Sequence, residues 1–331
     1  MDLVRASHLY KVFGKHEREV IERLKAGESR EDLASLGTAA VIDVSFEVAK
    51  AETFVVMGLS GSGKSTLIRM INGLWAPSEG TVEVAGKVVS DMNDAQLREL
   101  RRDHVSMVFQ HFALLPHLTV RENAAYGLKL QGKLKSKDRL EKANEWLHTV
   151  GLKGWGDKYP HQLSGGMQQR VGLARALAAE TDILLMDEAF SALDPLIRRE
   201  MQDQLLELQS TLNKTIIFIT HDLNEAMYLG DHIAVMRNGR VAQIGTSDEI
   251  LTQPADDYVA DFVQDVDRSR VLTASAVMRP TEAVVSGSAD PRRVQRIMDQ
   301  HDWVGVFVVD EHRRLLGMVA VSYTHLRAHE T

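Results

Sequence analysis

The segment at residues 54–66 reads FVVMGLSGSGKST and decides the fold of the chain. Its apolar start, which ends at Met57, is typical of a buried strand, and the stretch from Thr66 to Asn72 is typical of a helix. Between them lies the spacing of a phosphate-binding loop, G-x-x-x-x-G-K-S. A glycine-serine turn can match this spacing by chance, but a strand before it and a helix after it argue against that alternative. We therefore predict a loop that binds nucleotide phosphates.

Each part of this loop has a role toward a polyphosphate. Glycines let backbone amides curl around the β- and γ-phosphates, the start of the helix adds partial positive charge, and Lys64 adds a full charge. Ser65 offers its hydroxyl to magnesium. The predicted nucleotide-binding residues of the segment are Gly58, Ser60, Gly61, Ser62, Gly63, Lys64, Ser65 and Thr66.

Two carboxylates end another apolar run, residues 183–188, which reads ILLMDE. This is the arrangement expected of a Walker B element in a phosphoryl-transfer site. We expect Asp187 to hold magnesium and Glu188 to act as the general base or to orient the attacking water. Two acids after a strand are often only an exposed loop, but the phosphate-binding loop lies upstream and His221 follows another apolar strand downstream. The combination favours catalysis.

The bulk composition argues against several other classes of protein. With 331 residues, of which 44% are hydrophobic and 26% charged, the chain is typical of a globular protein of about two domains. Its formal net charge of -7 argues against a main role in coating nucleic acid. The apolar runs are far shorter than the roughly 20 residues of a membrane span, and charged residues interrupt any secretory signal near the N-terminus. The absence of cysteine excludes a disulfide framework and a thiolate metal site.

Short β-branched runs alternate with longer helical stretches from Leu3 to about Gly245. This alternation predicts an α/β domain with a largely parallel sheet, whose strand ends carry the motifs. Helical stretches after Lys135 and from Met167 to Ala179 are expected to form a helical subdomain. The residues of the second stretch expected to face a core are Val171, Leu173, Ala174 and Leu177.

A charged insert, residues 15–40, interrupts the first β region. It contains five basic and six acidic residues, and its apolar spacing predicts two short amphipathic helices separated by Gly27. Glu19 and Arg23 are spaced for an ion pair along one helix face. The charge alone favours a solvated surface helix.

The chain restarts with a different pattern after Val271. We assign residues 1–255 to the nucleotide-binding domain, 256–270 to a polar, helical linker, and 271–321 to a small α+β module of strand-helix-strand-strand character. Residues 322–331 show no convincing periodicity, so the module is expected to be truncated. This tail resembles translated sequencing-adaptor read-through, which would make it non-native.

Residues 163–168 read LSGGMQ and directly precede a predicted helix. Ser164, Gly165 and Gly166 at a helix N-terminus make an anion cradle, although a simple helix cap is the alternative. The motif resembles the signature of ATP-binding-cassette (ABC) ATPases, with Met167 in place of the commoner glutamine and Gln168 beside it. The resemblance implies a P-loop NTPase fold and a head-to-tail dimer in which the cradle binds the nucleotide of a second ATPase subunit.

Four further features match motifs of the ABC family and occur in the same order along the chain as in that family. By this resemblance, Phe13 stacks on adenine, Gln110 is the glutamine-loop residue near magnesium, and His221 is the switch histidine. The D-loop corresponds to residues 191–194, which end at Asp194. Each residue alone would carry little weight, because lone aromatic, glutamine and histidine residues are usually structural. The order and spacing give them their significance.

The sequences around the motifs resemble those of one group of ABC proteins, the ATPase subunits of glycine betaine/L-proline (quaternary amine) importers. The segments concerned are residues 57–64, 108–117 and 186–198, together with the insert after Phe13 and Gly14. The group also carries tandem CBS modules, and the C-terminal module resembles the first of them.

This resemblance implies ATP and magnesium as cofactors. It implies membrane-spanning permease subunits and an extracytoplasmic solute-binding protein as partners, with no nucleic acid, and a peripheral position on the cytoplasmic face of the membrane. One alternative is an ABC importer ATPase for another small solute. A non-transport ABC ATPase acting on DNA or ribosomes would call for coiled coils, two cassettes or a basic surface. A catalytically inactive sensor is opposed by the joint presence of Lys64, Glu188 and His221.

Overall fold

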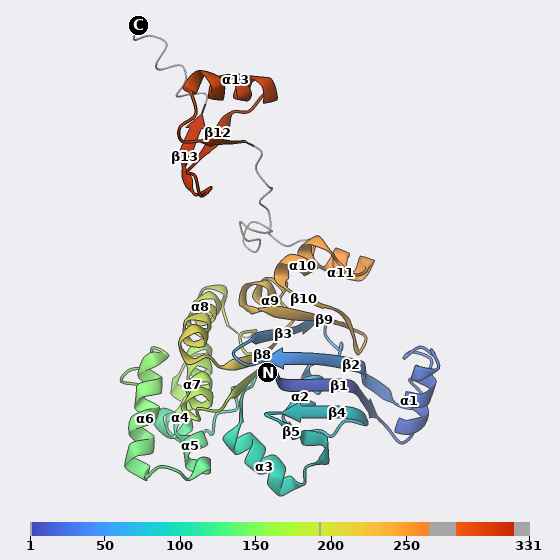
Figure 1. Cartoon of the computed structure of the whole chain (residues 1–331). Coiled ribbons are helices and arrows are strands. Elements are labelled where there is room, and N and C mark those ends of the chain that lie inside the picture. The colour runs from blue at the N-terminus through green and yellow to red at the C-terminus, as the bar shows by residue number, and fades with distance from the viewer. Residues whose placement is uncertain (1, 111, 192, 265–282, 321–331) are drawn as a thin grey trace. The chain divides into compact units, whose positions relative to one another are not determined.

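The structure is a computed structural model that describes residues 2–110, 112–191, 193–264 and 283–320. The chain divides into two compact units, Met1–Leu272 and Thr273–Thr331 (Figure 1). The last part of the expected linker, the start of the expected C-terminal module and the expected tail lie outside the described residues, as do His111 and Ala192. The two units are described separately below.

A six-stranded sheet in the order β10-β9-β3-β8-β7-β6 forms the centre of the first unit. All neighbouring strands pair in parallel except β10, which runs antiparallel to β9. The largely parallel sheet expected from the sequence is therefore confirmed. Strands β3, β7 and β8 are buried along their whole length, as strands covered on both faces are. The strands are β3 (Thr53–Gly58), β6 (Val105–Val108), β7 (Ile183–Asp187), β8 (Thr215–Thr220), β9 (His232–Arg237) and β10 (Arg240–Gly245).

A second, antiparallel sheet in the order β2-β1-β4-β5 was not expected from the sequence. Its strands are β1 (Asp2–Phe13), β2 (Thr38–Ala49), β4 (Glu79–Val84) and β5 (Lys87–Val88). Along β2 buried and exposed residues largely alternate, which is typical of a sheet with one covered face. The pairing of β1 with β2 spans the charged insert, and Phe13 lies opposite Thr38 at its base.

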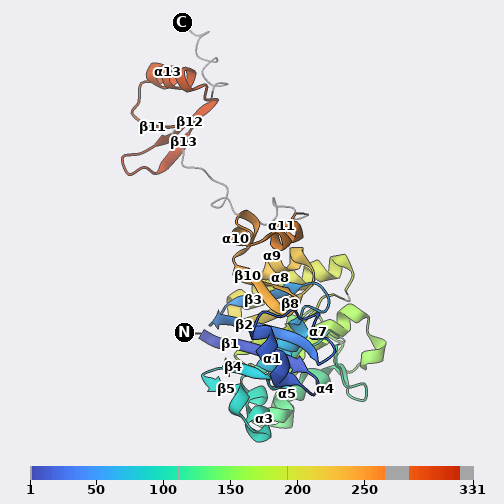
Figure 2. The same cartoon turned by 90° about the vertical axis from the view of Figure 1, so that its right-hand side faces the viewer.

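Helices surround the central sheet and form a separate group at one side (Figures 1 and 2). Helices α4, α5, α6 and α7 contact one another, and all four predicted core residues of α7 are buried. The two predicted helical stretches are thus helices that pack against each other, α6 and α7. The helices not treated elsewhere are α2 (Lys64–Ile71), α3 (Asp94–Asp103), α4 (Val120–Ala124), α5 (Tyr126–Gln131), α6 (Ser136–Thr149), α7 (Gly165–Ala178), α8 (Pro195–Leu212), α9 (Leu223–Leu229) and α10 (Ser247–Thr252), with 3-10 turns η1 (Val89–Asp91) and η2 (Pro160–Gln162). None of the helices in the described ranges combines the length and hydropathy that a membrane-spanning helix requires.

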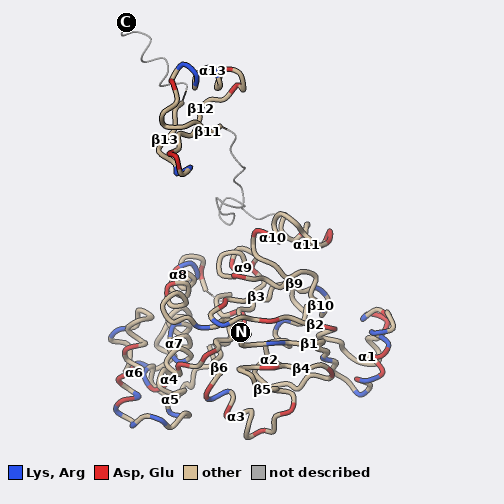
Figure 3. The backbone as a smooth tube through the Cα atoms, viewed as in Figure 1, with Lys and Arg blue, Asp and Glu red and all other residues tan. Residues whose placement is uncertain are grey.

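The insert contains one helix, α1 (Glu17–Lys25), rather than the two that we expected. Charges of both signs line it (Figure 3). Residues 30–36 form turns, with bonds such as Leu36 N–H to the Leu33 carbonyl, because the chain must return within a few residues to pair with Phe13. Leu33 is nevertheless fully buried against the apolar face of α1.

Helix α11 (Asp257–Phe262) corrects the expected boundary of the first unit. The sequence assigned residues 256–270 to a polar linker, but Val259 and Val263 are buried in the core of the first unit. Their apolar spacing, shared with Tyr258 and Phe262, presents one helix face to that core. The first unit therefore continues past residue 255.

Over residues 283–320, the described part of the second unit, the chain has the strand-helix-strand-strand order expected from the sequence. The elements of this part are β11 (Val284–Ser286), α13 (Pro291–His301), β12 (Gly305–Val309) and β13 (Leu315–Ala320). Strand β12 is central, parallel to β11 and antiparallel to β13. The small core consists of Val285, Val294, Met298 and Val306. Leu315, Leu316 and Met318 on β13 are exposed.

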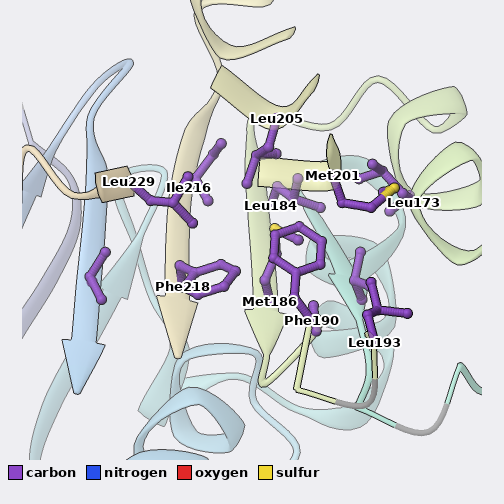
Figure 4. Close-up of a cluster of buried hydrophobic side chains, with 14 of the residues drawn as sticks. Leu173, Leu184, Met186, Phe190, Leu193, Met201, Leu205, Ile216, Phe218 and Leu229 are labelled. Carbon is purple, nitrogen blue, oxygen red and sulfur yellow. The ribbon is translucent and has the colours of Figure 1, made fainter. Parts of the chain in front are cut away.

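The largest core of the first unit lies between the central sheet and helices α7 to α9 (Figure 4). Phe190 and Phe218 are fully buried there, and their ring centroids lie 5.5 Å apart. Phe218 is on β8, three residues before His221, so this core supports the strand that carries a predicted site residue.

Replacing Phe218 with alanine is expected to lower the free energy of unfolding by about 3–5 kcal/mol, because the cavity left in a closed core adds to the lost burial. Urea unfolding followed by tryptophan fluorescence measures this. Leu196→Ala is the control, since Leu196 is 78% exposed and its loss should change stability by less than about 0.5 kcal/mol. Equal effects of the two substitutions would contradict the packing described here.

Candidate active site

The phosphate-binding loop, the Walker B carboxylates and His221 come from the carboxyl ends of three strands of the central sheet. The loop at residues 58–63 connects β3 to α2, Asp187 ends β7, and His221 directly follows β8. In the central sheet these strands lie in the order β3-β8-β7 and are parallel. Their carboxyl ends therefore meet at one edge, which is where ligands bind in open α/β sheets.

The backbone of the phosphate-binding loop requires glycine at two positions. Gly58 and Gly63 have φ angles of 152° and 101°, and a Cβ atom would lie 2.3 Å from the Met236 carbonyl oxygen or 2.2 Å from that of Ala40. Gly63 is also the N-cap of α2 and makes no side-chain bond to the first helix amides. Those amides are the donors that an anion at a helix start accepts from.

The Lys64 ammonium lies against the same loop. Its Nζ donates to the carbonyl oxygens of Gly58 at 2.7 Å and Leu59 at 3.1 Å. The residue is 4% exposed, and this burial lowers the pKa of Lys64, whereas the nearby carboxylates of Glu188 and Asp187 act to raise it. A cation is thus held inside the site by backbone carbonyls.

Ser65 and Asp187 meet at the start of α2. The Ser65 hydroxyl donates to Asp187 Oδ1 over 3.0 Å. Burial raises the pKa of Asp187, while the hydrogen bond from Ser65 and the charge of Arg69 oppose that rise. The pair offers a hydroxyl and a carboxylate oxygen side by side.

Two other predicted residues, Gln110 and His221, converge on Glu188. Its Oε2 accepts a hydrogen bond from Gln110 Nε2 at 3.1 Å and lies 3.3 Å from His221 Nδ1. The backbone at Glu188 has a φ of 45°, a conformation that is uncommon and costly outside glycine. Its N–H donates to the Ile219 carbonyl at 3.0 Å, and Ser191 Oγ donates to its carbonyl at 2.9 Å. These bonds hold the carboxylate in place.

A cavity of about 390 Å³ lies beside these groups. Phe13, packed edge-on against Trp75 with ring centroids 5.0 Å apart, forms part of its wall. The other lining residues are Arg30, Thr38, Ala40, Ser60, Gly61, Ser62, Gly63, Lys64, Ser65, Thr66 and Glu188. Sequence reasoning did not select Arg30, because its position depends on how the turn after α1 folds.

The predicted signature residues do not line this cavity within the described part of the chain. Ser164 caps α7 by accepting from the Met167 N–H at 3.4 Å, and a Cβ on Gly166 would lie 2.9 Å from Ile197 Cγ2. Asp194 caps α8 by accepting from the Ile197 N–H at 3.1 Å. The structure therefore separates these residues from the loop of the same chain.

Two arginines that the sequence did not single out support the site. Arg198 donates to the Leu193 carbonyl at 3.1 Å and to Asp222 Oδ2 at 3.3 Å, and so connects the D-loop segment to the residue after His221. Arg175 donates to the carbonyl oxygens of Phe112 and Ala113, shortly after Gln110, and burial lowers the pKa of Arg175. Only the folded positions of these long side chains reveal the contacts.

The fold and the site together define a P-loop ATPase of the ATP-binding-cassette class. A family model described as ABC transporter matches residues 41–191. The structure is similar to the dimeric ATP-binding cassette MJ0796 in a post-hydrolysis state bound to ADP and Pi, with a TM-score of 0.64 and 32% identity over 74% of this chain and 98% of that chain.

Comparison with curated proteins identifies the group within the ABC class to which the chain is similar. The glycine betaine transport ATP-binding protein OpuAA of Bacillus subtilis is 49% identical over 321 residues, which are 96% of this chain and 76% of OpuAA. The glycine betaine/carnitine transport ATP-binding protein GbuA of Listeria monocytogenes is 52% identical over 322 residues, covering 96% of this chain and 81% of GbuA. The chain therefore belongs to the glycine betaine transport group of ABC transporter ATP-binding proteins, and it is an ATP-binding ATPase. The resemblance drawn from the motifs is confirmed.

Proposed function

We propose that the chain is the ATP-hydrolysing subunit of an importer for a compatible solute such as glycine betaine or proline. The convergence of Gln110 and His221 on the Glu188 carboxylate, at the wall of a cavity lined by the phosphate-binding loop, supports the hydrolytic role. The similarity to glycine betaine transport proteins supports the solute. An importer of another small solute is the alternative.

Nucleotide binding would use the cavity residues as follows. Phe13 supplies an aromatic surface for adenine, and the amides of residues 60–66 donate to the phosphates. The Lys64 ammonium, now on two loop carbonyls, would exchange these neutral acceptors for phosphate oxygens, which make stronger charge-assisted hydrogen bonds.

The donor set at Ser65 and Asp187 fits magnesium. Both offer hard oxygen atoms, as Mg²⁺ prefers, and they lie in contact at 3.0 Å. No group of three or more acidic, histidine or cysteine residues suited to hold a metal occurs within the described ranges, which agrees with an ion that takes most of its ligands from phosphates and water. We assign Ser65, Gln110 and Asp187 to this ion, whose charge would offset that of the phosphates.

In hydrolysis Glu188 would accept the proton of the attacking water or orient it. Gln110 and His221 position the carboxylate through the contacts at 3.1 and 3.3 Å. Because His221 also borders Glu188 from the neighbouring strand, it would link the state of the nucleotide to β8. We assign Glu188 and His221 as the catalytic residues.

The separation of the signature residues from the cavity supports a head-to-tail dimer. Ser164, Gly165 and Gly166 would complete the site of a second ATPase subunit, with Asp194 at the same interface. The neighbouring MJ0796 structure is dimeric. Each nucleotide would then be enclosed by two chains.

An apolar surface on the first unit supports docking of membrane-spanning subunits. A cavity of about 360 Å³ lies among α3, α5, α7 and β6, and Leu74, Phe109 and Leu130 at its lining are 49%, 37% and 60% exposed. Exposed apolar patches commonly mark interaction sites. We propose that permease subunits dock here, that the chain is peripheral to the cytoplasmic face of the membrane, and that a separate solute-binding protein supplies specificity.

We also propose that the second unit is CBS-like and regulatory. Its strand-helix-strand-strand order and three-stranded sheet support this. The exposed Leu315, Leu316 and Met318 on β13 provide an apolar surface on which a second such module could pack.

The test is ATPase activity of the chain assembled in lipid vesicles with its membrane and solute-binding subunits. Glycine betaine is expected to stimulate hydrolysis, and an unrelated sugar is not. Lys64→Ala should abolish the stimulated activity, because losing a charge-assisted contact weakens ATP binding roughly tenfold or more. Lys50→Ala, which removes an exposed lysine, should leave it unchanged.

Stimulation by another solute but not by quaternary amines or proline would overturn the proposed substrate and favour the alternative importer. Full activity of Lys64→Ala would overturn the proposed nucleotide site.

A further inference from the structure

The insert that precedes β2 is fixed close to the nucleotide cavity. It leaves the sheet after Phe13 and returns at Thr38, which pairs with Phe13. At this base a Cβ on Gly14 would lie 3.0 Å from Gly37 Cα, so the two ends of the insert lie in close contact. The insert therefore begins and ends beside a wall of the cavity.

Contacts on several sides hold the insert in this position. Val20, Ile21 and Leu24 of α1 and Leu33 after it are buried against the strand residues Tyr10, Val12, Ala39 and Ile42. Glu17 Oε2 accepts from Ser78 Oγ at 2.7 Å, and Lys25 pairs with Glu79 on β4. The turn that carries Arg30 is thus attached to a packed element and lies three residues from the buried Leu33.

Arg30 lies at the phosphate-binding loop. It lines the nucleotide cavity together with Ser60, Gly61 and Ser62. It also lines an adjoining cavity of about 410 Å³, again with these loop residues and with Arg237. The backbone amides of this kind of loop cradle the phosphates of a bound nucleotide, and its lysine reaches the outer phosphates.

The Arg30 guanidinium has no anionic partner in the part of the chain that the structure describes. Two acids of the same turn are engaged elsewhere, since Arg23 binds Glu28 through two hydrogen bonds and Ser29 donates to Asp32. Glu31 and Asp256 line a third cavity together with Arg30. Arg237, the other arginine of the adjoining cavity, stacks on the Tyr258 ring at 4.5 Å. Among the described residues lining the two cavities, Glu188 is the single carboxylate.

We propose that Arg30 binds the terminal phosphates of ATP and that the insert is therefore part of the nucleotide site. A partly buried, unpaired guanidinium beside the loop matches phosphate geometry, which its planar donors can bind in a bidentate manner. The matched family model begins at residue 41, so it does not include this cation. The proposal rests on the nucleotide site proposed above.

Equilibrium binding of ATP, ADP and AMP to the full chain tests the proposal. Arg30→Gln is expected to weaken ATP binding roughly five- to tenfold, the range for loss of a charge-assisted contact at a partly exposed site. The loss should shrink from ATP to ADP to AMP as the phosphates near Arg30 are removed. Arg30→Lys should recover part of the affinity, since it keeps the charge without the planar fork. Arg18→Gln removes the same charge from the exposed part of α1 and should bind ATP normally.

Unchanged ATP affinity in Arg30→Gln would overturn the proposal, as would an equal loss in Arg18→Gln or equal losses for ATP, ADP and AMP. A defect confined to dimer formation would overturn it as well, because it would assign Arg30 to the partner subunit. Lys64→Ala distinguishes failure of the proposed nucleotide site from failure of the proposal for Arg30. If Lys64→Ala binds ATP normally, the proposed nucleotide site is wrong. If Lys64→Ala loses ATP binding while Arg30→Gln keeps it, only the role of Arg30 and the insert is wrong.

Discussion

Glu188→Gln is expected to lower the turnover of ATP about 100- to 10,000-fold, the range for loss of a general base. The amide keeps the size of the carboxylate, and its carbonyl oxygen can still accept the Gln110 hydrogen bond now made to Oε2. What it loses is the ability to take a proton from water. ATP binding should persist, because Lys64 and the loop amides remain, and an ATP-bound dimer should accumulate.

Phosphate release at saturating ATP measures this effect, and gel filtration with ATP measures the dimer. Glu207→Gln, on the exposed face of α8, makes the same chemical change away from the site and should retain full turnover. Near-normal phosphate release by Glu188→Gln would remove Glu188 from its proposed role.

Ser164→Arg is expected to abolish hydrolysis while sparing the chain's own phosphate-binding loop. A bulky cation would fill the cradle that we propose for the nucleotide of the partner. The substitution also removes the cap bonded to the Met167 N–H, which costs about 1 kcal/mol. Ser164→Ala removes that cap without adding bulk, so it should keep substantially more activity. ATP-driven dimerisation and hydrolysis are the measurements.

Mixing chains tests whether the Ser164→Arg defect acts in trans. A dimer of one Ser164→Arg and one Lys64→Ala chain has one site with both lesions and one site with neither. The mixture should therefore recover activity that neither variant shows alone. Normal dimerisation of pure Ser164→Arg protein, or no recovery on mixing, would contradict the shared site.

The sequence predicted those parts of the site that depend on neighbours in the chain. The segment from Thr53 to Ile71 folds as strand, loop and helix because apolar pattern, glycines and helix start are contiguous. Asp187 at the end of β7 and His221 directly after β8 were predicted in the same way, because each adjoins an apolar run in the sequence. Family order placed Gln110 at the site, near magnesium, but its contact with Glu188 was not predicted, since no periodicity places residues 78 positions apart in contact.

Features set by distant contacts were missed. The antiparallel sheet depends on pairing across the insert, and the turn at residues 30–36 replaces a predicted helix because the chain returns to Thr38. Helix α11 was taken for a linker because its polar residues obscured the apolar face that Val259 and Val263 bury. Arg30 and Arg198 look like ordinary surface charges until the fold places them.

The fit of the phosphate-binding loop against Met236 and Ala40 has a consequence for the kinetics of nucleotide capture. The loop backbone is fixed by the ends of β9 and by β2, and Lys64 is already ordered on its carbonyls. The phosphate-binding loop therefore loses its conformational entropy during folding and not when the nucleotide binds. Nucleotide association need not wait for a loop to close, so encounter and charge, rather than rearrangement of this loop, should govern the rate of capture.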